Sequence, residues 1–281
     1  MTFISYAQNY EDVMLWRALR QVENGFYIDV GANDPLSMSI TRAFYDKGWH
    51  GINIEPVPEC AARLAAERSR DITLQLCAGA TSGTVVLYDI PNTQLATIDE
   101  DVVAMHRENG REVRTLTAQI KPLSKICAEH VKGEIHFLKI DVEGAEQSVL
   151  QGMDFARWRP WIVLVEATTP TTINASYQPW EPLLLNARYE FAYFDGLNRF
   201  YIAAEHAELK PAFSHPPGLR DDFIKYDIAA MLAQATANAN EFHLRAVVAE
   251  DRVRRMRGSF SWRCTSPLRW LRRQWENIAP K

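Results

Sequence analysis

The sequence predicts an α/β fold of the Rossmann-like kind, in which a mainly parallel sheet is covered by helices on both faces. Between residues 26 and 167, short apolar segments typical of buried strands alternate with segments of helical periodicity. Several of the strand segments end in acidic residues. Because the carboxyl ends of parallel strands meet at one edge of a sheet, we expect these residues to converge on a ligand site.

The expected elements follow one another in a regular order. A leading helix covers residues 6–22, with Ser5 near its start as a cap. The strands expected after it lie at 25–31, 51–56, 72–80, 83–90, 135–144 and 161–167, and the helices at 39–48, 57–70, 145–152 and 181–187. A polar insertion at 94–113 is of a kind that often shapes substrate pockets. Aromatic alternating runs at 189–203 flank Asp195-Gly196-Leu197-Asn198 and predict an antiparallel hairpin that completes the sheet.

Composition indicates one enlarged domain with a terminal extension. The chain has 281 residues, 47% of them hydrophobic, and its net charge of −4 exerts no overall pull on nucleic acid, so we expect no nucleic-acid partner. Its four cysteines lie far apart without a CxxC pair, which predicts isolated thiols and no zinc site. The N-terminus lacks the basic start and apolar core of a signal peptide, and no apolar run approaches the ~20 residues that span a bilayer. We therefore expect a cytoplasmic protein.

The C-terminal part reads as an extension of the domain. Residues 216–257 contain an alanine-rich helical stretch whose apolar positions recur without a strong heptad, which indicates a protruding or partner-packing helix and leaves a homo-oligomer open. Residues 258–281 are basic with interleaved aromatics and lack the apolar content for their own core, so we expect weak order. Such residues bind anionic membrane surfaces, so peripheral membrane contact at the inner face is one expectation; a solvated tail is the other.

The turn after the first strand points to a nucleoside cofactor. Gly31 lets the backbone approach a ligand, and Glu55, which ends the next strand, can accept both ribose hydroxyls. A dinucleotide site needs three spaced glycines to admit a pyrophosphate, whereas this turn has one glycine and is acidic. Asp29 and Asp34 would repel a pyrophosphate but can bind the ammonium of a methionine moiety. We therefore predict S-adenosylmethionine; the alternative is that Asp29 and Gly31 merely build a turn.

A second acidic segment supplies candidates for catalysis. Period-two alternation puts Lys139, Asp141 and Glu143 on one side of a buried strand, and Glu166 ends the next strand. A hydroxyl that accepts a methyl group must lose its proton, and any of the three carboxylates is a candidate base, with Lys139 as their counter-ion. Mg²⁺ is the alternative use of the trio; we do not favour it, because the spacing does not match a defined metal loop.

These segments together resemble the FkbM-type methyltransferases from Tyr6 to about Tyr201. The resemblance rests on SYAQNYEDVMLW, YIDVGAND, INIEPVPE, LKIDVEGAEQSVLQG and VLVEA, in that order. It implies a class I methyltransferase fold over residues 1–215, with a mainly parallel seven-stranded sheet, and S-adenosylmethionine-dependent methylation of hydroxyls on polyketides or sugars. The cofactor residues it implies, with their neighbours in the turns, are Asp29, Gly31, Ala32, Asn33, Asp34, Glu55, Pro56, Cys77, Ala78 and Asp141. At position 35 this chain has proline where the family often has a glycine after the GAN turn.

The acceptor is indicated less directly. Tyr6 and Gln8 are candidates to reach over the acceptor from the N-terminal segment, and Arg199 is a candidate from the hairpin. The tail SFSWRCTSPLRWL resembles terminal segments of bacterial enzymes that build surface polysaccharides. We therefore expect a sugar or glycan acceptor and a role in surface polysaccharide biosynthesis.

Two other functions remain alternatives. A nicotinamide-dependent oxidoreductase or epimerase is disfavoured by the single-glycine turn and by the lack of a YxxxK-type pair. A catalytically inactive binding module of a polysaccharide assembly complex would use the same carboxylates only to maintain the fold.

Overall fold

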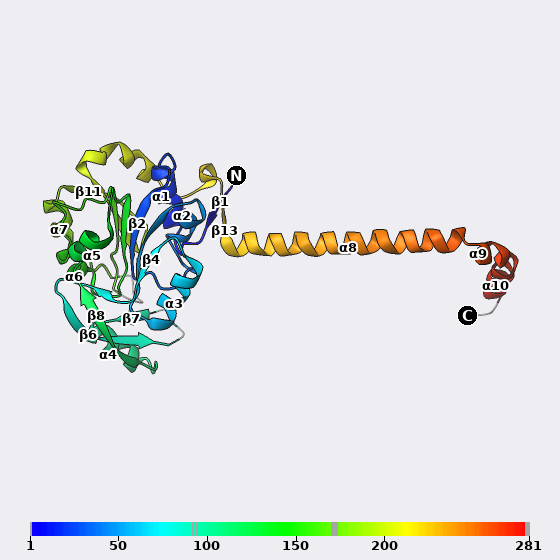
Figure 1. Cartoon of the computed structure of the whole chain (residues 1–281), viewed down its shortest axis with the longest axis horizontal. Helices are drawn as coiled ribbons and strands as arrows, with labels where there is room; N and C mark the ends of the chain where they lie inside the picture. The colour runs from blue at the N-terminus through cyan, green and yellow to red at the C-terminus, as the bar shows by residue number, and fades with distance from the viewer. Residues whose placement is uncertain (1, 92, 94, 170–173, 279–281) are drawn as a thin grey trace. The chain divides into compact units, whose positions relative to one another are not determined.

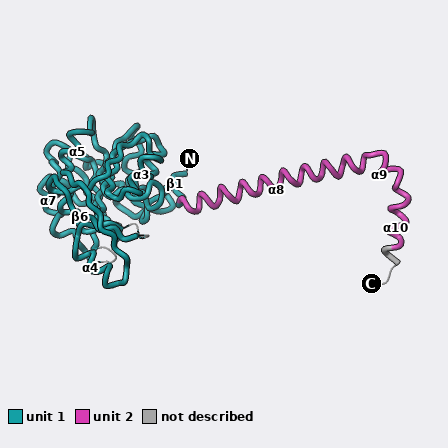
Figure 2. The backbone as a smooth tube through the Cα atoms, turned by 60° about the horizontal axis from the view of Figure 1, so that its bottom comes forward, with its two compact units in different colours: residues 1–225 teal, residues 226–281 magenta. Residues whose placement is uncertain are grey.

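A computed structural model of the chain describes residues 2–91, 93, 95–169 and 174–278. The chain divides into two compact units, residues 1–225 and 226–281 (Figure 2). The first unit continues past residue 215, the boundary predicted from the sequence. The reason is a short pairing: β13 (Phe223–Lys225) lies parallel to β1 (Phe3–Ser5) and ties this segment to the start of the chain.

A seven-stranded sheet forms the centre of the first unit, in the order β11-β12-β10-β9-β2-β3-β4. Its strands are β2 (Phe26–Val30), β3 (His50–Ile54), β4 (Ile72–Leu74), β9 (Phe137–Ile140), β10 (Ile162–Glu166), β11 (Tyr189–Phe194) and β12 (Asn198–Ala203). From β4 to β10 each neighbouring pair is parallel, whereas β12 runs antiparallel to both β10 and β11. The α/β prediction and the predicted hairpin are confirmed, and the sheet is mixed rather than purely parallel.

Helices cover both faces of this sheet. They are α1 (Glu11–Leu19), α2 (Arg42–Asp46), α3 (Pro58–Glu67), α5 (Leu123–His130), α6 (Glu146–Gln151) and α7 (Glu181–Asn186), with 3₁₀ segments at Ala204–Phe213 and Leu219–Asp221. Ile28 and Val30 of β2 pack in one core with α5, α6 and α7, while Tyr27 packs in a second core with α1 and α2 (Figure 1). Burial on both faces explains why these strands are almost wholly apolar.

A second sheet of four strands, in the order β5-β8-β6-β7, adjoins the first (Figure 1). Its strands are β5 (Cys77–Ala78), β6 (Gly83–Ile90), β7 (Leu95–Thr97) and β8 (Arg114–Lys121), and α4 (Glu100–Glu108) follows β7. The single strand predicted at 72–80 is therefore divided between two sheets, because the backbone turns where Leu76 N–H donates to Leu74 O (3.0 Å). β8 and α5 were not predicted; most β8 side chains are exposed or half-buried, so its apolar signal is weak.

The predicted helix at 6–22 is shorter than expected and begins at Glu11. The buried carboxylate of Asp12 accepts hydrogen bonds from the Ser5 hydroxyl and the Tyr6 N–H, both at 2.7 Å, and these bonds hold residues 5–7 in a turn. Tyr10 then takes a left-handed conformation (φ 63°) that helix geometry does not allow. Ser5 is therefore a partner of Asp12 and not a helix cap.

The described part of the second unit consists of three consecutive helices, α8 (Tyr226–Gly258), α9 (Phe260–Cys264) and α10 (Ser266–Ile278). The tail expected to be weakly ordered is thus helical in the structure, because Leu268, Leu271 and Trp275 recur at helical spacing. Within the described residues, no helix combines the length and the apolar character needed to cross a bilayer. All four cysteines are free, as predicted.

Candidate functional site

A cavity of about 330 Å³ opens at the carboxyl edge of the seven-stranded sheet. The ends of β2, β3 and β9 form its floor, and β6 and β7 of the smaller sheet form a wall, so the insertion contributes to the pocket as expected. Nine predicted cofactor residues line it together: Asp29, Gly31, Ala32, Asn33, Glu55, Pro56, Cys77, Ala78 and Asp141. The topology therefore brings residues from four separate stretches of sequence to one place.

Gly31 is required by the packing of two strand ends. Its φ is 76°, and a Cβ built there would lie 1.8 Å from the carbonyl oxygen of Asp141. The sequence suggested that this glycine makes room for a ligand. The structure shows instead that it lets the turn after β2 press against the turn after β9.

Lys139 of β9 joins these two turns. Its ammonium donates to the Gly31 carbonyl (2.6 Å) and lies 3.3 Å from Asp29 Oδ1 and 3.5 Å from Asp141 Oδ2. Burial alone would lower the pKa of Lys139, but the two carboxylates outweigh it and raise the pKa above its usual value. The predicted counter-ion role of Lys139 therefore agrees with its geometry.

A buried arginine that the sequence reasoning missed supports the same turn. Arg68 is fully buried and donates to the Thr41 hydroxyl (2.6 Å) and the Pro35 carbonyl (2.6 Å). The Thr41 hydroxyl in turn donates to Asp29 Oδ2 (2.7 Å). Nothing in the local sequence distinguishes Arg68 from its neighbour Arg70, so only the tertiary structure identifies this support.

Glu55 holds the other side of the turn. Its Oε2 accepts from the Asn33 N–H and its Oε1 accepts from the Val57 N–H, both at 2.8 Å. Burial raises the pKa of this carboxyl, although the two N–H groups act in the opposite direction. Each oxygen keeps a second lone pair, so Glu55 can still accept a hydroxyl of a bound ligand.

Asp34 does not lie where the sequence reasoning put it. Its Oδ1 accepts from the backbone N–H groups of Leu36 and Ser37 (2.8 Å each), and its Oδ2 pairs with Arg63 (2.8 Å). It is not among the described residues that line the cavity. The expected contact of Asp34 with an ammonium group is therefore wrong. An aspartate side chain is short enough to accept from the N–H groups two and three residues later, and here it stabilises the turn instead.

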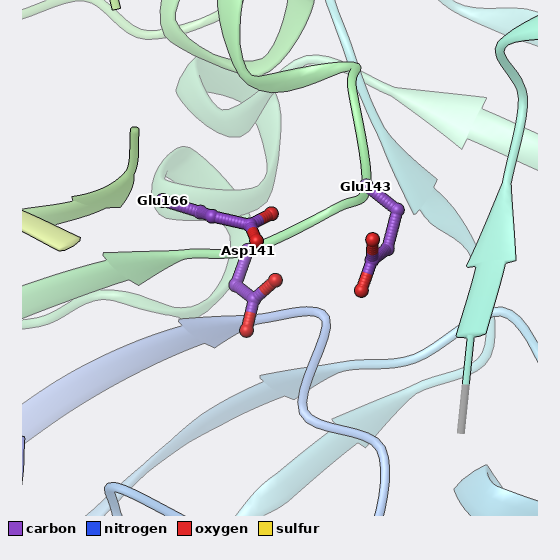
Figure 3. Close-up of side chains that lie close together, drawn as sticks. All are labelled: Asp141, Glu143 and Glu166. Atoms are coloured by element: carbon purple, nitrogen blue, oxygen red, sulfur yellow. The ribbon is translucent and has the colours of Figure 1, made fainter. Parts of the chain in front are cut away.

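Three carboxylates converge beside the cavity, as predicted. Asp141, Glu143 and Glu166 each offer an oxygen within 4.8 Å of the others (Figure 3). Asp141 and Glu143 line the cavity. Glu166, at the end of β10, does not line it and is only 7% exposed. Its Oε2 has no hydrogen-bond partner among the described residues.

The loop that carries Glu143 is strained and held in place. Glu143 has a φ of 56°, a conformation that costs a non-glycine residue roughly 1–2 kcal/mol. Its carbonyl accepts from the Thr97 hydroxyl (2.7 Å), and the Glu146 carboxylate accepts from the Val142 and Gly144 N–H groups (3.2 and 3.1 Å). Glu146 therefore fixes the loop, and strain of this kind is typical of functional sites.

Glu143 and Glu166 differ in how far their pKa values are raised. Burial, followed by the charges of Asp141 and Glu146, raises the pKa of Glu143 to about 8. Burial and the charges of Asp141 and Glu143 raise the pKa of Glu166 still further above its usual value. At neutral pH Glu166 is thus a neutral acid, while Glu143 titrates near the pH at which a general base works best.

The N-terminal segment reaches the cavity through Gln8 and Glu11, both of which line it. Glu11 accepts from the Asn198 amide of the hairpin (2.8 Å), a contact that the sequence reasoning missed because Asn198 looks like an ordinary turn former. Tyr6, in contrast, donates its hydroxyl to Asp46 (2.9 Å) and is absent from the described lining. Of the two predicted acceptor residues in this segment, only Gln8 faces the cavity.

Arg199 also lies elsewhere. Its guanidinium donates to the Glu181 carboxylate and the Tyr201 hydroxyl (2.8 Å each) and stacks 3.9 Å above the Tyr177 ring. Side chains alternate along a strand, so Asn198 faces the cavity and Arg199 faces the other side of β12. The expected acceptor contact of Arg199 is therefore not supported.

A second cavity of about 330 Å³ lies beside Gly144, the residue after Glu143. Asp99, Asp101, Ser176 and Trp180 are among its lining residues. The Trp180 Nε1 and the Ser176 Oγ are buried and make no hydrogen bond to the described residues. Unsatisfied buried polar atoms of this kind favour a polar ligand.

Comparison with known proteins identifies a family. The sequence model described as "Methyltransferase FkbM domain" matches residues 29–191, more than half of the chain. A search of curated proteins finds no match. Among solved structures, a TehB-like SAM-dependent methyltransferase from Corynebacterium glutamicum is similar at 7% identity over 69% of this chain and 88% of that chain, with a TM-score of 0.39.

The raised pKa of Glu166 predicts how stability depends on pH. The folded state keeps a proton that the unfolded state releases above pH ~4.5, so the free energy of unfolding should fall with rising pH, by up to about 1.4 kcal/mol per pH unit. Glu166→Gln removes this loss, and the variant should gain stability relative to the original chain between pH 5 and pH 8 in urea unfolding. The exposed Glu134→Gln serves as control. Parallel stability profiles for all three proteins would contradict the prediction.

Proposed function

We propose, since the chain belongs to the FkbM methyltransferase family, that it transfers a methyl group from S-adenosylmethionine to a hydroxyl of a sugar or glycan. The strand order β4-β3-β2-β9-β10-β12-β11, with β12 alone reversed, supports a class I methyltransferase fold of the Rossmann-like kind. In such a fold the ligand lies at the carboxyl ends of the strands, which is where the larger cavity opens.

The observation that carries the proposal is the acidic lining of this cavity. Among the described residues that line it, the acidic ones are Glu11, Asp29, Glu55, Asp141 and Glu143, and the only basic one is Lys139. Lys139 is already paired with Asp29 and Asp141. The raised pKa values of Glu11 and Glu143, both about 8, leave these two acids largely protonated at neutral pH, but Asp29 and Asp141 still outnumber the one lysine. Such a lining favours a cationic ligand and disfavours a pyrophosphate, which argues for a sulfonium nucleoside and against a dinucleotide.

The residues present fit such a cofactor. Asp29 Oδ1 already faces the Lys139 ammonium at 3.3 Å, whereas the Asp141 side chain is 37% exposed, lines the cavity and suits an ammonium group. Glu55 suits the ribose hydroxyls, and Cys77 and Ala78 offer an apolar surface to the base. When bound, S-adenosylmethionine supplies the electrophilic methyl group.

Glu143 is the best base of the three candidates. Asp141 is paired with Lys139, and Glu166 is held neutral by its raised pKa. Glu143 lines the cavity and has a pKa near 8, so its carboxylate can take the proton of the acceptor hydroxyl as the oxygen attacks. Glu166 and Asp141 lie beside this base, and their fixed positions set the electrostatic potential at its carboxylate.

We propose that the acceptor, apart from the hydroxyl that reacts beside Glu143, lies in the second cavity, next to the loop that carries Glu143. Its Trp180 N–H and Ser176 hydroxyl, which make no hydrogen bond to the described residues, offer donors, and the carboxylates of Asp99 and Asp101 offer acceptors. A molecule with many hydroxyl groups matches such a surface. This match supports a sugar or glycan, and surface polysaccharide synthesis is the process we infer for it.

The cofactor assignment is tested by calorimetry with two ligands. S-adenosylhomocysteine should bind with micromolar affinity and NAD should not bind. Glu55→Gln should weaken the first ligand about tenfold or more, because an amide nitrogen would face a backbone N–H. The exposed Glu59→Gln, at the start of α3, should leave it unchanged. Preferential binding of NAD would favour the oxidoreductase or epimerase alternative.

Glu143→Gln tests the base. The variant should lose about 10²–10⁴-fold in kcat with nearly unchanged affinity for S-adenosylhomocysteine, because only proton removal is affected. In the original chain, kcat should rise with pH through about 8, where the Glu143 carboxyl loses its proton. Glu134→Gln is the matched control. Loss of activity in EDTA, restored by Mg²⁺, would instead assign the trio to a metal, and no turnover on any acceptor would favour an inactive binding module.

Ser176→Ala tests the acceptor cavity while keeping its packing. The variant should raise the KM for the methylated sugar several-fold, because one hydrogen bond to a hydroxyl is lost. Its affinity for S-adenosylhomocysteine should not change, and Ser214→Ala, at an exposed position, should behave as the original chain. The assay uses nucleotide sugars and methyl glycosides as acceptors. Turnover confined to phenols or amines would contradict the sugar assignment.

We also propose that α10 contacts an anionic membrane surface at the inner face of the membrane. Its apolar side carries Leu268, Leu271 and Trp275, each more than half exposed. Arg269, Arg272 and Arg273 lie on its basic side. A short helix with these two sides gains both apolar burial and attraction to acidic headgroups.

Vesicle co-sedimentation tests this contact. The full chain should bind vesicles containing phosphatidylglycerol and should bind pure phosphatidylcholine much more weakly. Leu271→Glu should reduce binding at least tenfold, whereas Leu219→Glu, the same change at a fully exposed site in the first unit, should not. Equal binding by both variants would rule out the apolar side of α10.

A further inference from the structure

The helix α8 exposes a continuous apolar seam. Counted along its 33 residues, apolar side chains recur with alternating steps of four and three. The nine positions of this seam are Ile228, Leu232, Ala235, Ala239, Phe242, Ala246, Ala249, Val253 and Met256. The sequence reasoning missed a strong heptad here, because Met231, Leu244, Val247 and Val248 add apolar residues outside the seam.

The seam has the period and the length of a coiled coil. Alternating steps of four and three repeat every seven residues, which keeps one stripe facing a partner along the whole helix. From 228 to 256 the seam covers 29 residues, or about four heptads, and three to four heptads are what a sustained coiled-coil pattern requires.

Within the described part of the second unit, nothing buries this seam. None of the 33 side chains of α8 is buried, and Leu232 and Phe242 are 56% and 68% exposed. A long helix gains most of its stability in water from packing one face, and not from helix propensity alone. The exposed seam therefore calls for a partner with a matching stripe.

We propose that the partner is α8 of a second copy of this chain, in a parallel coiled coil. A second copy supplies a stripe of the same length and register. Alanines at four seam positions allow the two backbones to approach closely on both sides of Phe242. Leu232 and Val253 fill the layers further out.

The charges beside the seam agree with a parallel pair in its central part. Arg245 and Glu250 are five residues apart and occupy the two positions that face each other across parallel helices. The dimer therefore contains two such ion pairs, each between Arg245 of one copy and Glu250 of the other. Arg252 and Arg257 occupy the equivalent positions one heptad later and repel, so the electrostatic contribution is confined to the centre and the apolar seam provides most of the attraction.

Sedimentation equilibrium on the full chain tests the proposal. The original chain should be a dimer at micromolar concentration. Phe242→Glu, which puts a charge into the seam, should raise the dissociation constant at least about 100-fold. Leu244→Glu makes the same change at an equally exposed site two residues away, outside the seam, and should leave the dimer intact.

Two further measurements keep the outcome decisive. Leu232→Glu should dissociate the dimer as Phe242→Glu does, and thermal unfolding of each variant shows whether the first unit remains folded. A monomeric original chain at 50 µM, a dimer that survives both seam variants, or equal dissociation by Leu244→Glu would each overturn the coiled coil.

Discussion

The site depends on one buried ammonium group. Lys139 lies between the turn after β2 and the turn after β9, where it contacts the Gly31 carbonyl and the carboxylates of Asp29 and Asp141. Removing a lysine from water is costly unless its charge is paired. The two carboxylates provide that pairing, and in return the lysine allows both acids to lie side by side at the sheet edge.

A single lysine cannot neutralise the remaining acids around the cavity. The pKa values of Glu11, Glu143 and Glu166 are raised, mainly because these side chains are buried. A protein gains no stability from such an arrangement, because each proton held in the folded state weakens folding as the pH rises. The acids are therefore better explained by what they bind and by the proton that one of them accepts.

The strained and supported backbone around these acids points the same way. Glu143 keeps its left-handed conformation because Thr97 and Glu146 hold the loop from both sides. The turn after β2 is supported by Arg68, which donates to the Thr41 hydroxyl, and this hydroxyl in turn donates to Asp29. These supports come from the second sheet, from the start of α6 and from the end of α3, so both turns of the site are held by elements outside the strands that carry them.

The sequence alone determined the α/β class, the terminal hairpin, the family and the convergence of Asp141, Glu143 and Glu166, because strand periodicity places the ends of parallel strands at one edge. Only the tertiary structure decided which of the candidate residues face the cavity. Asp34 and Arg199 have the right chemistry for a ligand, but their partners are Arg63 and Glu181. The choice between a turn, an ion pair and a ligand contact depends on which groups the fold brings within hydrogen-bond distance, and these groups are far away in the chain.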